Sequence, residues 1–276
     1  MSSESRPKIL FVTAGLGGLF FEEAADRLAH QAQSFGLFDR VHAVKEPEII
    51  EICPRLVEWF SLGELRSTKG FGWYTWKATI AFEAIVEKRW GDFDLVMYLD
   101  AGCEMFHSSF SQKRLEDYII HATKFGNTLF AIPTPEIVYT KRDLFDYFPN
   151  LNANDTTNQF QSGSWILKMD ASLEFVSAWE SLSSLGIHMT DESPSKKTED
   201  NRFLVHRYDQ SIFSLLAKSF GFTPISDTPP GNTQTFQAKI RAFFFPFWWT
   251  RNRTGMTVIP IFMQKAAKLS LKLKSS

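Results

Sequence analysis

The predicted fold depends on one stretch of the chain, Asp94-Leu95-Val96-Met97-Tyr98-Leu99-Asp100-Ala101-Gly102-Cys103-Glu104. Its apolar run between two aspartates predicts a strand that is buried on both faces, as in a parallel α/β sheet. Asp100 falls at the carboxyl end of that strand, the edge at which open α/β sheets bind ligands. Gly102 permits a sharp turn, and Glu104 adds a second carboxylate. Such a pair could hold a hard cation and, through it, a diphosphate. The alternative is a strand that ends in a solvated turn.

Composition places the chain among globular proteins. Its 276 residues suffice for one large α/β domain or two small ones. The hydrophobic share of 44% and the charged share of 22% are those of a chain that can bury a core. The net charge of −1 gives no case for a nucleic-acid partner. The 27 Phe and 8 Trp are prominent: many are expected in the core, and surplus aromatics often line sites for flat or ring-shaped ligands.

The chain also carries signals about its compartment. Its two cysteines, Cys53 and Cys103, form no disulfide framework and favour a reducing compartment. Met1 to Lys8 is polar and does not resemble a secretory signal. No apolar run approaches the length of a bilayer span. We therefore expect a cytoplasmic protein, either soluble or peripheral to a membrane.

The amino-terminal residues predict a parallel strand–helix–strand unit. Apolar runs at Ile9 to Val12 and Val41 to Val44 indicate strands, and Leu19 to Phe35 carries apolar residues at helical spacing. The stretch Gly15 to Gly18 lies between the first strand and the helix. It resembles a phosphate-binding loop, although a sharp turn without a ligand is an equal alternative.

The stretch Lys69 to Lys77 contains four aromatic residues, two glycines and two lysines. The aromatics could stack on a base or a sugar, and Lys77 could neutralise phosphate. The alternative is an aromatic hinge packed into the core. A helix is expected to follow from Ala78 to Trp90, ended by Gly91.

Three motifs occur in a fixed order, namely Gly72-x-x-x-Trp76-Lys77, Tyr98 to Gly102, and His206 to Gln210. Together they resemble nucleotide-sugar glycosyltransferases of the GT-A type, most closely bacterial enzymes that build surface polysaccharide or lipopolysaccharide. The resemblance implies a Rossmann-like α/β sandwich with a mainly parallel central sheet. It also implies transfer of a sugar from a nucleotide-sugar, a UDP-sugar being one candidate, to a hydroxyl of a glycan or glycolipid.

The resemblance implies a donor-binding half of the fold. In this chain its residues are Thr13, Ala14, Gly15, Trp76, Lys77, Asp100, Ala101 and Gly102. These transferases hold a divalent metal, Mn²⁺ or Mg²⁺, with an Asp-x-Asp motif, and here Gly102 stands at the second aspartate. Either Glu104 joins Asp100 as a metal ligand, or the enzyme works without a metal.

The second half resembles the acceptor side of these transferases. After a helix at Ser111 to Lys124 and a short strand at Leu129 to Ile132, a polar turn enters another strand. Its candidate acceptor-binding residues are Gln161, Ser162, Gly163 and Trp165, together with Gln210 from the third motif. Gln161 could bond sugar hydroxyls and Trp165 could stack on a sugar, or the tryptophan could be core. A helix at Ala171 to Leu182 is expected to bury Leu173, Val176, Trp179 and Leu182.

Asp209 is the candidate catalytic residue. The resemblance places it at the acceptor face, as the general base of an inverting enzyme or as a donor-positioning group in a retaining one. The alternative is a helix cap, because aspartate accepts hydrogen bonds from the first amides of a helix. The preceding polar stretch, Thr190 to Asn201, predicts a mobile loop, which is either a lid or a solvated insertion.

The last residues differ in composition from the rest. Phe243 to Trp249 is an aromatic cluster, and Arg251 and Arg253 follow it as candidate ligands of donor phosphates. Lys265 to Lys274 reads as a basic amphipathic helix. It predicts either contact with an anionic membrane surface, where a lipid-linked acceptor would lie, or a solvated terminal helix.

We therefore expect a GT-A-like domain over residues 7–228 and an aromatic and basic extension over residues 229–276. Two other classes remain open. A different Rossmann-like enzyme, such as a methyltransferase, would use Gly15 to Gly18 for its cofactor. A relative that binds sugar-nucleotide or glycan without transfer would explain the missing second aspartate.

Overall fold

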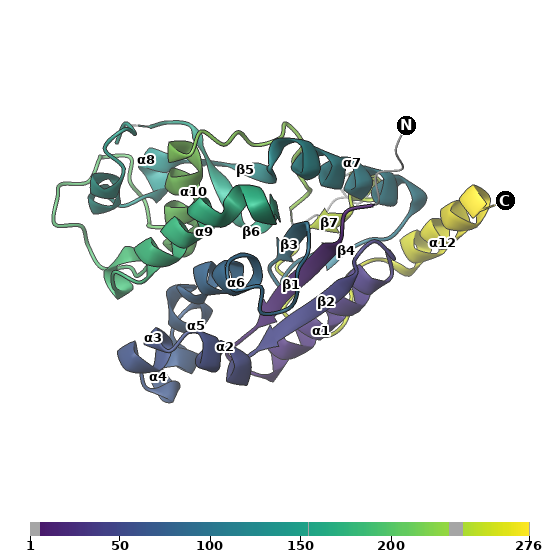
Figure 1. Ribbon diagram of the computed structural model, residues 1–276, viewed down its shortest axis with the longest axis horizontal. Coiled ribbons are helices and arrows are strands. Elements are labelled where there is room, and N and C mark those ends of the chain that lie inside the picture. The colour runs from purple at the N-terminus through teal and green to yellow at the C-terminus, as the bar shows by residue number, and fades with distance from the viewer. Residues whose placement is uncertain (1–5, 154, 232–239, 276) are drawn as a thin grey trace.

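The computed structural model describes residues 6–153, 155–231 and 240–275. Its centre is a five-stranded sheet in the order β2-β1-β3-β6-β5 (Figure 1). The strands are β1 (Ile9–Gly15), β2 (Arg40–Lys45), β3 (Leu95–Leu99), β5 (Asn127–Pro135) and β6 (Asn158–Lys168). β1 is parallel to β2 and β3, whereas β6 is antiparallel to both β3 and β5. The prediction of an α/β fold with a mainly parallel sheet is confirmed.

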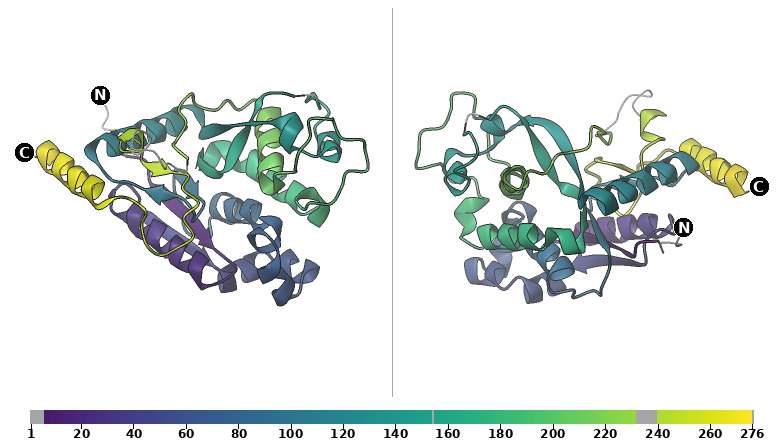
Figure 2. Two further views of the ribbon diagram at one scale, coloured as in Figure 1. Left: turned by 180° about the vertical axis from the view of Figure 1, so that it is seen from behind. Right: turned by 45° about the horizontal axis from the view of Figure 1, so that its top comes forward.

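The long helices form a layer on each face of the sheet (Figures 1 and 2). One face packs α1 (Leu19–Gln33) and α7 (Ser109–Phe125), and the other packs α6 (Trp76–Ile85), α9 (Met169–Ser183) and α10 (Tyr208–Ser219). β3 serves both layers, because Leu95, Met97 and Leu99 lie in one core cluster. Val96 and Tyr98 lie in the other. The apolar run predicted this burial on both faces.

The chain also forms further helices and helical turns. They are α2 (Glu46–Ile52), α3 (Arg55–Trp59), α4 (Leu62–Ser67), α5 (Gly70–Trp73), α8 (Glu136–Tyr139), the 3₁₀ turns Arg142–Tyr147 and Ile187–Met189, and the carboxyl-terminal α12 (Ile261–Ser275). Within the described ranges, no helix combines the length and the apolar character needed to cross a bilayer. Cys53 and Cys103 are both buried free thiols.

The segment after residue 228 contributes to the same folded body. Its strand β7 (Phe247–Trp248) pairs antiparallel with β4 (Glu104–Met105). Phe247 is fully buried and packs edge-on against Phe130 of the central sheet. Figure 2 shows the chain then running along α1 before it enters α12.

Three details differ from the sequence expectations. Strand β5 continues through Pro133 and Pro135, because it is an edge strand and a missing backbone N–H costs little there. α6 begins at Trp76 and ends at Ile85 instead of spanning Ala78 to Trp90. Leu173 is 43% exposed, since the buried stripe of α9 runs through Ser172, Phe175, Val176 and Trp179, beside it on the helix surface.

Candidate functional site

The turn that leads into α6 has a strained backbone. Phe71, Trp73 and Tyr74 have φ values of 55°, 58° and 62°, in the left-handed region that side chains disfavour. Among the described residues only three other non-glycine residues have positive φ, and two of these, Tyr208 and Arg251, belong to segments that border this turn or the Asp100 turn. Such strain persists only where surrounding structure holds it, and it tends to cluster at functional sites.

Lys77 is the central charge of the site. It lies in the first turn of α6, and its side chain is 5% exposed. Its Nζ is 2.9 Å from Asp100 Oδ1 and 3.3 Å from Asp209 Oδ2, so one ammonium group joins two carboxylates. Burial lowers the pKa of Lys77, but Asp100 and then Asp209 outweigh burial and raise that pKa overall. Lys77 is therefore a fixed positive charge that holds two acidic side chains together.

Asp100 is the accessible member of this cluster, with 39% of its side chain exposed. It follows β3, and its backbone N–H donates to Gly163 O at 2.9 Å. The hydroxyl of Tyr98 donates to Asp100 Oδ1 at 2.9 Å. A Cβ on Gly163 would lie 2.3 Å from Asp100 Oδ2, so a side chain there would displace the carboxylate. Position 163 of β6 thus needs glycine to leave room for Asp100.

Asp209 is the buried acid of the cluster, with a side chain that is 6% exposed. It is the second residue of α10, and the residue before that helix, Arg207, makes no side-chain cap. The capping interpretation is therefore wrong, because the carboxylate points to Lys77 and accepts a hydrogen bond from Ser162. Burial is the largest influence and raises the pKa of Asp209, while Lys77 and Ser162 oppose it. A carboxylate with a raised pKa is a stronger base than an exposed one.

Three aromatic rings, those of Trp73, Tyr74 and Tyr208, form a wall next to Lys77. The Tyr74 ring lies under Lys77 Nζ at 5.0 Å. Tyr208 stacks against Trp73 at 5.6 Å between ring centroids and lies 5.7 Å from Tyr74. All three rings are partly exposed, so this wall can contact a ring-shaped ligand.

Two of the predicted acceptor-binding residues, Trp165 and Gln210, are buried in the protein interior. Trp165 is 1% exposed, with its ring stacked on Tyr98 at 5.3 Å and edge-on to Trp179 at 6.4 Å. A sugar cannot reach its face, so we correct the stacking prediction for Trp165. Gln210 is 8% exposed and donates to Gln159 Oε1 at 2.6 Å. Gln161, by contrast, is partly exposed on β6.

Several predicted donor residues are also structural. Trp76 is 5% exposed and donates to Gly70 O at 2.8 Å, which braces the strained turn. Thr13 and Ala14 are buried in β1. A Cβ on Gly15 would lie 2.3 Å from Phe21 O, so Gly15 lets the start of α1 pack on the strand. A surface hollow at the start of α1 is lined by Gly18, Leu19, Glu22, Glu46, Pro47 and Arg66.

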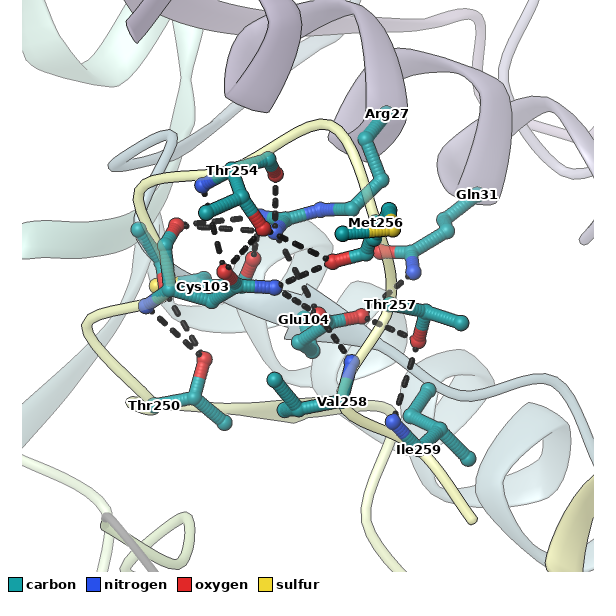
Figure 3. Close-up of polar contacts among 12 residues, drawn as sticks. Arg27, Gln31, Cys103, Glu104, Thr250, Thr254, Met256, Thr257, Val258 and Ile259 are labelled. Carbon is teal, nitrogen blue, oxygen red and sulfur yellow. Dashed lines mark hydrogen bonds and ion pairs between the residues drawn. The ribbon is translucent and has the colours of Figure 1, made fainter. Parts of the chain in front are cut away.

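Glu104 belongs to a separate buried cluster that binds the carboxyl-terminal segment (Figure 3). Its side chain is 0% exposed and forms an ion pair with Arg27 at 3.3 Å. Four further groups donate to its carboxylate, namely Gln31 Nε2, Asn252 Nδ2, Thr257 Oγ1 and the Val258 N–H. No lone pair of Glu104 is left for a metal, so we correct its assignment as a ligand.

Arg27 ties three distant segments together in Figure 3. Its guanidinium donates to Ala101 O and Cys103 O, both at 2.7 Å, and to Thr254 O at 2.9 Å. Burial, the largest influence, lowers the pKa of Arg27, while Glu104 acts to raise it. The Arg27–Glu104 pair therefore fixes the turn after β3 against residues 252–258.

This packing explains why glycine stands at position 102. Gly102 O accepts from Asn252 N at 2.9 Å and from Thr250 Oγ1 at 2.8 Å. A Cβ on Gly102 would lie 3.3 Å from Arg251 Cα. The carboxyl-terminal segment thus closely approaches the backbone where an Asp-x-Asp motif carries its second acid.

The same carboxyl-terminal segment contains two exposed arginines. Arg251 sits beside the Asp100 turn, and Arg253 lies over the Phe21 ring at 5.6 Å. The charge of Arg253 also acts to lower the pKa of Tyr74, although burial dominates and raises that pKa. Arg253 is therefore an exposed cation whose charge reaches Tyr74.

Asp100 is the remaining candidate ligand for a divalent metal. Within the described ranges, no three His, Cys, Asp or Glu side chains converge. Both oxygens of Asp100 face the Lys77 ammonium, at 2.9 and 3.1 Å, and a cation repels a metal ion from that position. These residues do not fit Mn²⁺ or Mg²⁺ in this arrangement.

The predicted mobile loop is anchored at many points. Lys141 Nζ contacts Asp191 Oδ1 at 3.2 Å, and Asp143 accepts from the backbone N–H groups of Lys196 and Lys197. Tyr208 donates to Glu192 at 2.5 Å, so the loop touches the aromatic wall. A lid role stays a prediction, and opening would break these bonds.

Sequence reasoning missed Arg27 and Asn252, and it included Tyr98 in a motif without giving that residue a role. Asn252 carried no local signal, because its partner Glu104 comes from another segment. Arg27 did carry one, since a charged residue on the apolar face of α1, between Ala24 and Leu28, needs a buried partner.

No family model and no curated protein matches the chain. It is similar to the apo crystal structure of mouse xyloside xylosyltransferase 1, with a TM-score of 0.44 and 12% identity over 91% of this chain and 100% of that one. It is also similar to a glycosyltransferase involved in glycosylation of the PBCV-1 major capsid, with a TM-score of 0.45 and 11% identity over 88% and 94%. Both of these matched structures are glycosyltransferases.

Proposed function

We propose that the chain is a GT-A-type glycosyltransferase that moves a sugar from a nucleotide-sugar, such as a UDP-sugar, to a hydroxyl of a glycan or glycolipid. One observation carries the proposal. A buried lysine joins two carboxylates from distant motifs, Asp100 at the carboxyl end of β3 and Asp209 at the start of α10. This edge of an α/β sheet is where ligands bind.

Asp209 has the role of general base in the inverting form of this reaction. The acceptor oxygen attacks the anomeric carbon and loses its proton to Asp209, while the bond from that carbon to the nucleoside diphosphate breaks. The diphosphate leaves with the bonding electrons. In the retaining form, Asp209 positions the donor sugar instead. Burial favours either role, because a carboxylate in a site without water interacts more strongly with the partial charges of a bound substrate.

Asp100 has the role of orienting the donor. Its carboxylate is fixed by Tyr98, Lys77 and the space at Gly163, yet it stays partly open to solvent. A carboxylate held in this way can accept hydrogen bonds from sugar hydroxyls in one orientation.

Arg251 and Arg253 have the role of neutralising the leaving diphosphate. The Lys77 ammonium already pairs with both Asp100 and Asp209, so we reassign its predicted phosphate contact to these arginines. Arginine matches phosphate geometry with two parallel hydrogen bonds. Charge neutralisation by side chains would make transfer insensitive to EDTA.

The test is transfer from a nucleotide-sugar panel by purified protein, measured as release of nucleoside diphosphate. Asp209→Asn is expected to reduce turnover at least about a hundredfold, the usual contribution of a general base. Asp117→Asn, at a surface position of α7 that is 57% exposed, is the matched control and should keep full activity. Full activity in Asp209→Asn would overturn the assignment.

The arginines are tested separately. The double variant Arg251→Ala/Arg253→Ala is expected to raise KM for the donor at least about tenfold while it leaves the melting temperature unchanged, because both side chains are exposed. An unchanged KM, or activity that requires Mn²⁺, would contradict the role of the arginines.

A further inference from the structure

The helix α12 stands away from the body of the protein at the carboxyl end of the chain (Figures 1 and 2). Its inner face is buried through Met263 and Ala267, which join a cluster with Phe106 and Trp248. Ser270 Oγ also accepts the N–H of Ser109 at the start of α7. One side of α12 is thus attached to the protein, and the opposite side is exposed.

The exposed side of α12 divides into two parallel stripes. At 100° per residue, Phe262, Leu269 and Leu273 fall within one narrow sector, and they are 56%, 59% and 70% exposed. Lys265 and Lys268, with Lys272, fall in the adjacent sector and are also exposed. The helix contains no acidic residue. An apolar stripe beside a purely basic one is the pattern of a helix that lies in an anionic lipid interface.

The apolar stripe continues onto the body of the protein. Phe110 and Phe244 are 53% and 39% exposed, and their rings meet edge-on at 5.2 Å. A surface hollow lined by Phe110, Lys113 and Leu273 joins α7 to α12. Asp117 pairs with Lys113 at 2.9 Å on the neighbouring surface of α7, so the charge of that lysine is balanced by a carboxylate. The unbalanced basic stripe is therefore confined to α12.

We propose that α12, with Phe110 and Phe244, docks the protein on an anionic membrane surface. Charge complementarity selects this partner, because the lysines attract anionic headgroups while the adjacent phenylalanine and leucine side chains enter the acyl boundary. A second copy of the chain would bring like-charged lysine stripes together. The proposal does not depend on glycosyl transfer, although a membrane-bound enzyme would meet a lipid-linked acceptor directly.

The experiment is co-sedimentation of the full chain with vesicles. One set contains phosphatidylcholine alone, and the other adds about a third phosphatidylglycerol. We expect binding to the anionic vesicles only, and weaker binding as salt rises, because salt screens charges near the surface. Equal binding to both sets, or binding to neither, would overturn the proposal.

Matched variants separate the two stripes. Lys265→Glu/Lys268→Glu should lower the partition coefficient at least about tenfold. Lys196→Glu/Lys197→Glu changes the net charge equally on the exposed loop and should bind as the wild type does.

Phe262→Ser/Leu269→Ser removes the apolar stripe and should lower partition to a similar extent. Leu173→Ser/Leu185→Ser removes two other exposed leucines and should not. All four variants should keep the wild-type melting temperature. If the α12 variants bind vesicles normally, or if light scattering shows a dimer that Phe262→Ser/Leu269→Ser disrupts, then α12 serves another purpose.

Discussion

Replacing Lys77 with methionine should destabilise the protein through the two carboxylates it leaves behind. The ammonium lies 2.9 Å from Asp100 and 3.3 Å from Asp209. At an effective dielectric constant of about 20, each such contact is worth roughly 5 kcal/mol before desolvation is subtracted. Removing one partner of a buried pair costs about 3–5 kcal/mol. Asp100 is 39% exposed and screened, so most of the loss falls on Asp209.

The pH dependence of Lys77→Met follows from Asp209. Burial already raises the pKa of Asp209 in the folded protein, and loss of Lys77 raises that pKa further. A raised carboxyl pKa destabilises the fold above that pKa, and the penalty fades as pH falls toward about 4, the value in the unfolded chain. The free energy of unfolding of the variant should therefore approach that of the wild type on acidification.

Urea denaturation at pH 8 and pH 5 measures both effects. We expect a loss of about 3–5 kcal/mol at pH 8 and a smaller loss at pH 5. The double variant Lys77→Met/Asp209→Asn should recover much of the loss, because the only carboxylate left without Lys77 is then Asp100, which is 39% exposed and solvated. Lys88→Met, which removes an exposed pair with Asp92, is the control and should lose less than about 1 kcal/mol. A loss below about 1 kcal/mol in Lys77→Met at pH 8, or no recovery in the double variant, would refute the reasoning.

Two further substitutions test the surroundings of the cluster. Gly163→Ala should push the Asp100 carboxylate aside and reduce kcat/KM at least about tenfold. The same clash should lower the free energy of unfolding by about 1–3 kcal/mol. Gly63→Ala, which meets no neighbour within 4 Å, is the control, and equal kinetics in the two variants would contradict the steric argument. Arg27→Met should cost about 3–5 kcal/mol, since it leaves Glu104 buried without a counter-charge. It should also expose residues 250–258 to limited proteolysis, and a wild-type digestion pattern would show that this pair does not hold the segment.

The sequence alone predicted the parts of the fold that depend on local pattern. The apolar run from Leu95 to Leu99 predicted a buried strand, and the structure confirms it. The apolar spacing after Leu19 predicted α1, which ends two residues earlier than expected. Both patterns report which face of an element is buried, and that is a property of consecutive residues.

The missed features depend on contacts between distant residues. Nothing near Glu104 shows that Arg27 and Asn252 will enclose it, so a buried structural acid resembled a metal ligand. Trp165 follows a polar turn, yet Tyr98 and Trp179 cover it. Lys77 is separated from Asp209 by 132 positions in the sequence, and only the fold shows that the Lys77 ammonium pairs with the carboxylates of Asp100 and Asp209.

The left-handed turn before α6 was beyond sequence reasoning as well. Two glycines in that stretch indicated unusual backbone, but Trp73 and Tyr74 also adopt positive φ. Aromatic residues rarely take that conformation, so local propensity argues against it. The surrounding packing decides the outcome, with Leu56 and Leu65 close to Gly72.

The most direct test of the central claim is thermal unfolding of the wild type with a panel of nucleotide-sugars and S-adenosylmethionine, each with Mn²⁺ and with EDTA. At a hundredfold excess over its Kd, a ligand of the folded state adds about 2.7 kcal/mol, which raises the melting temperature of a chain this size by several degrees. We predict stabilisation by at least one nucleotide-sugar, undiminished in EDTA. Stabilisation by S-adenosylmethionine alone, or by no nucleotide-sugar, would contradict the proposed transferase.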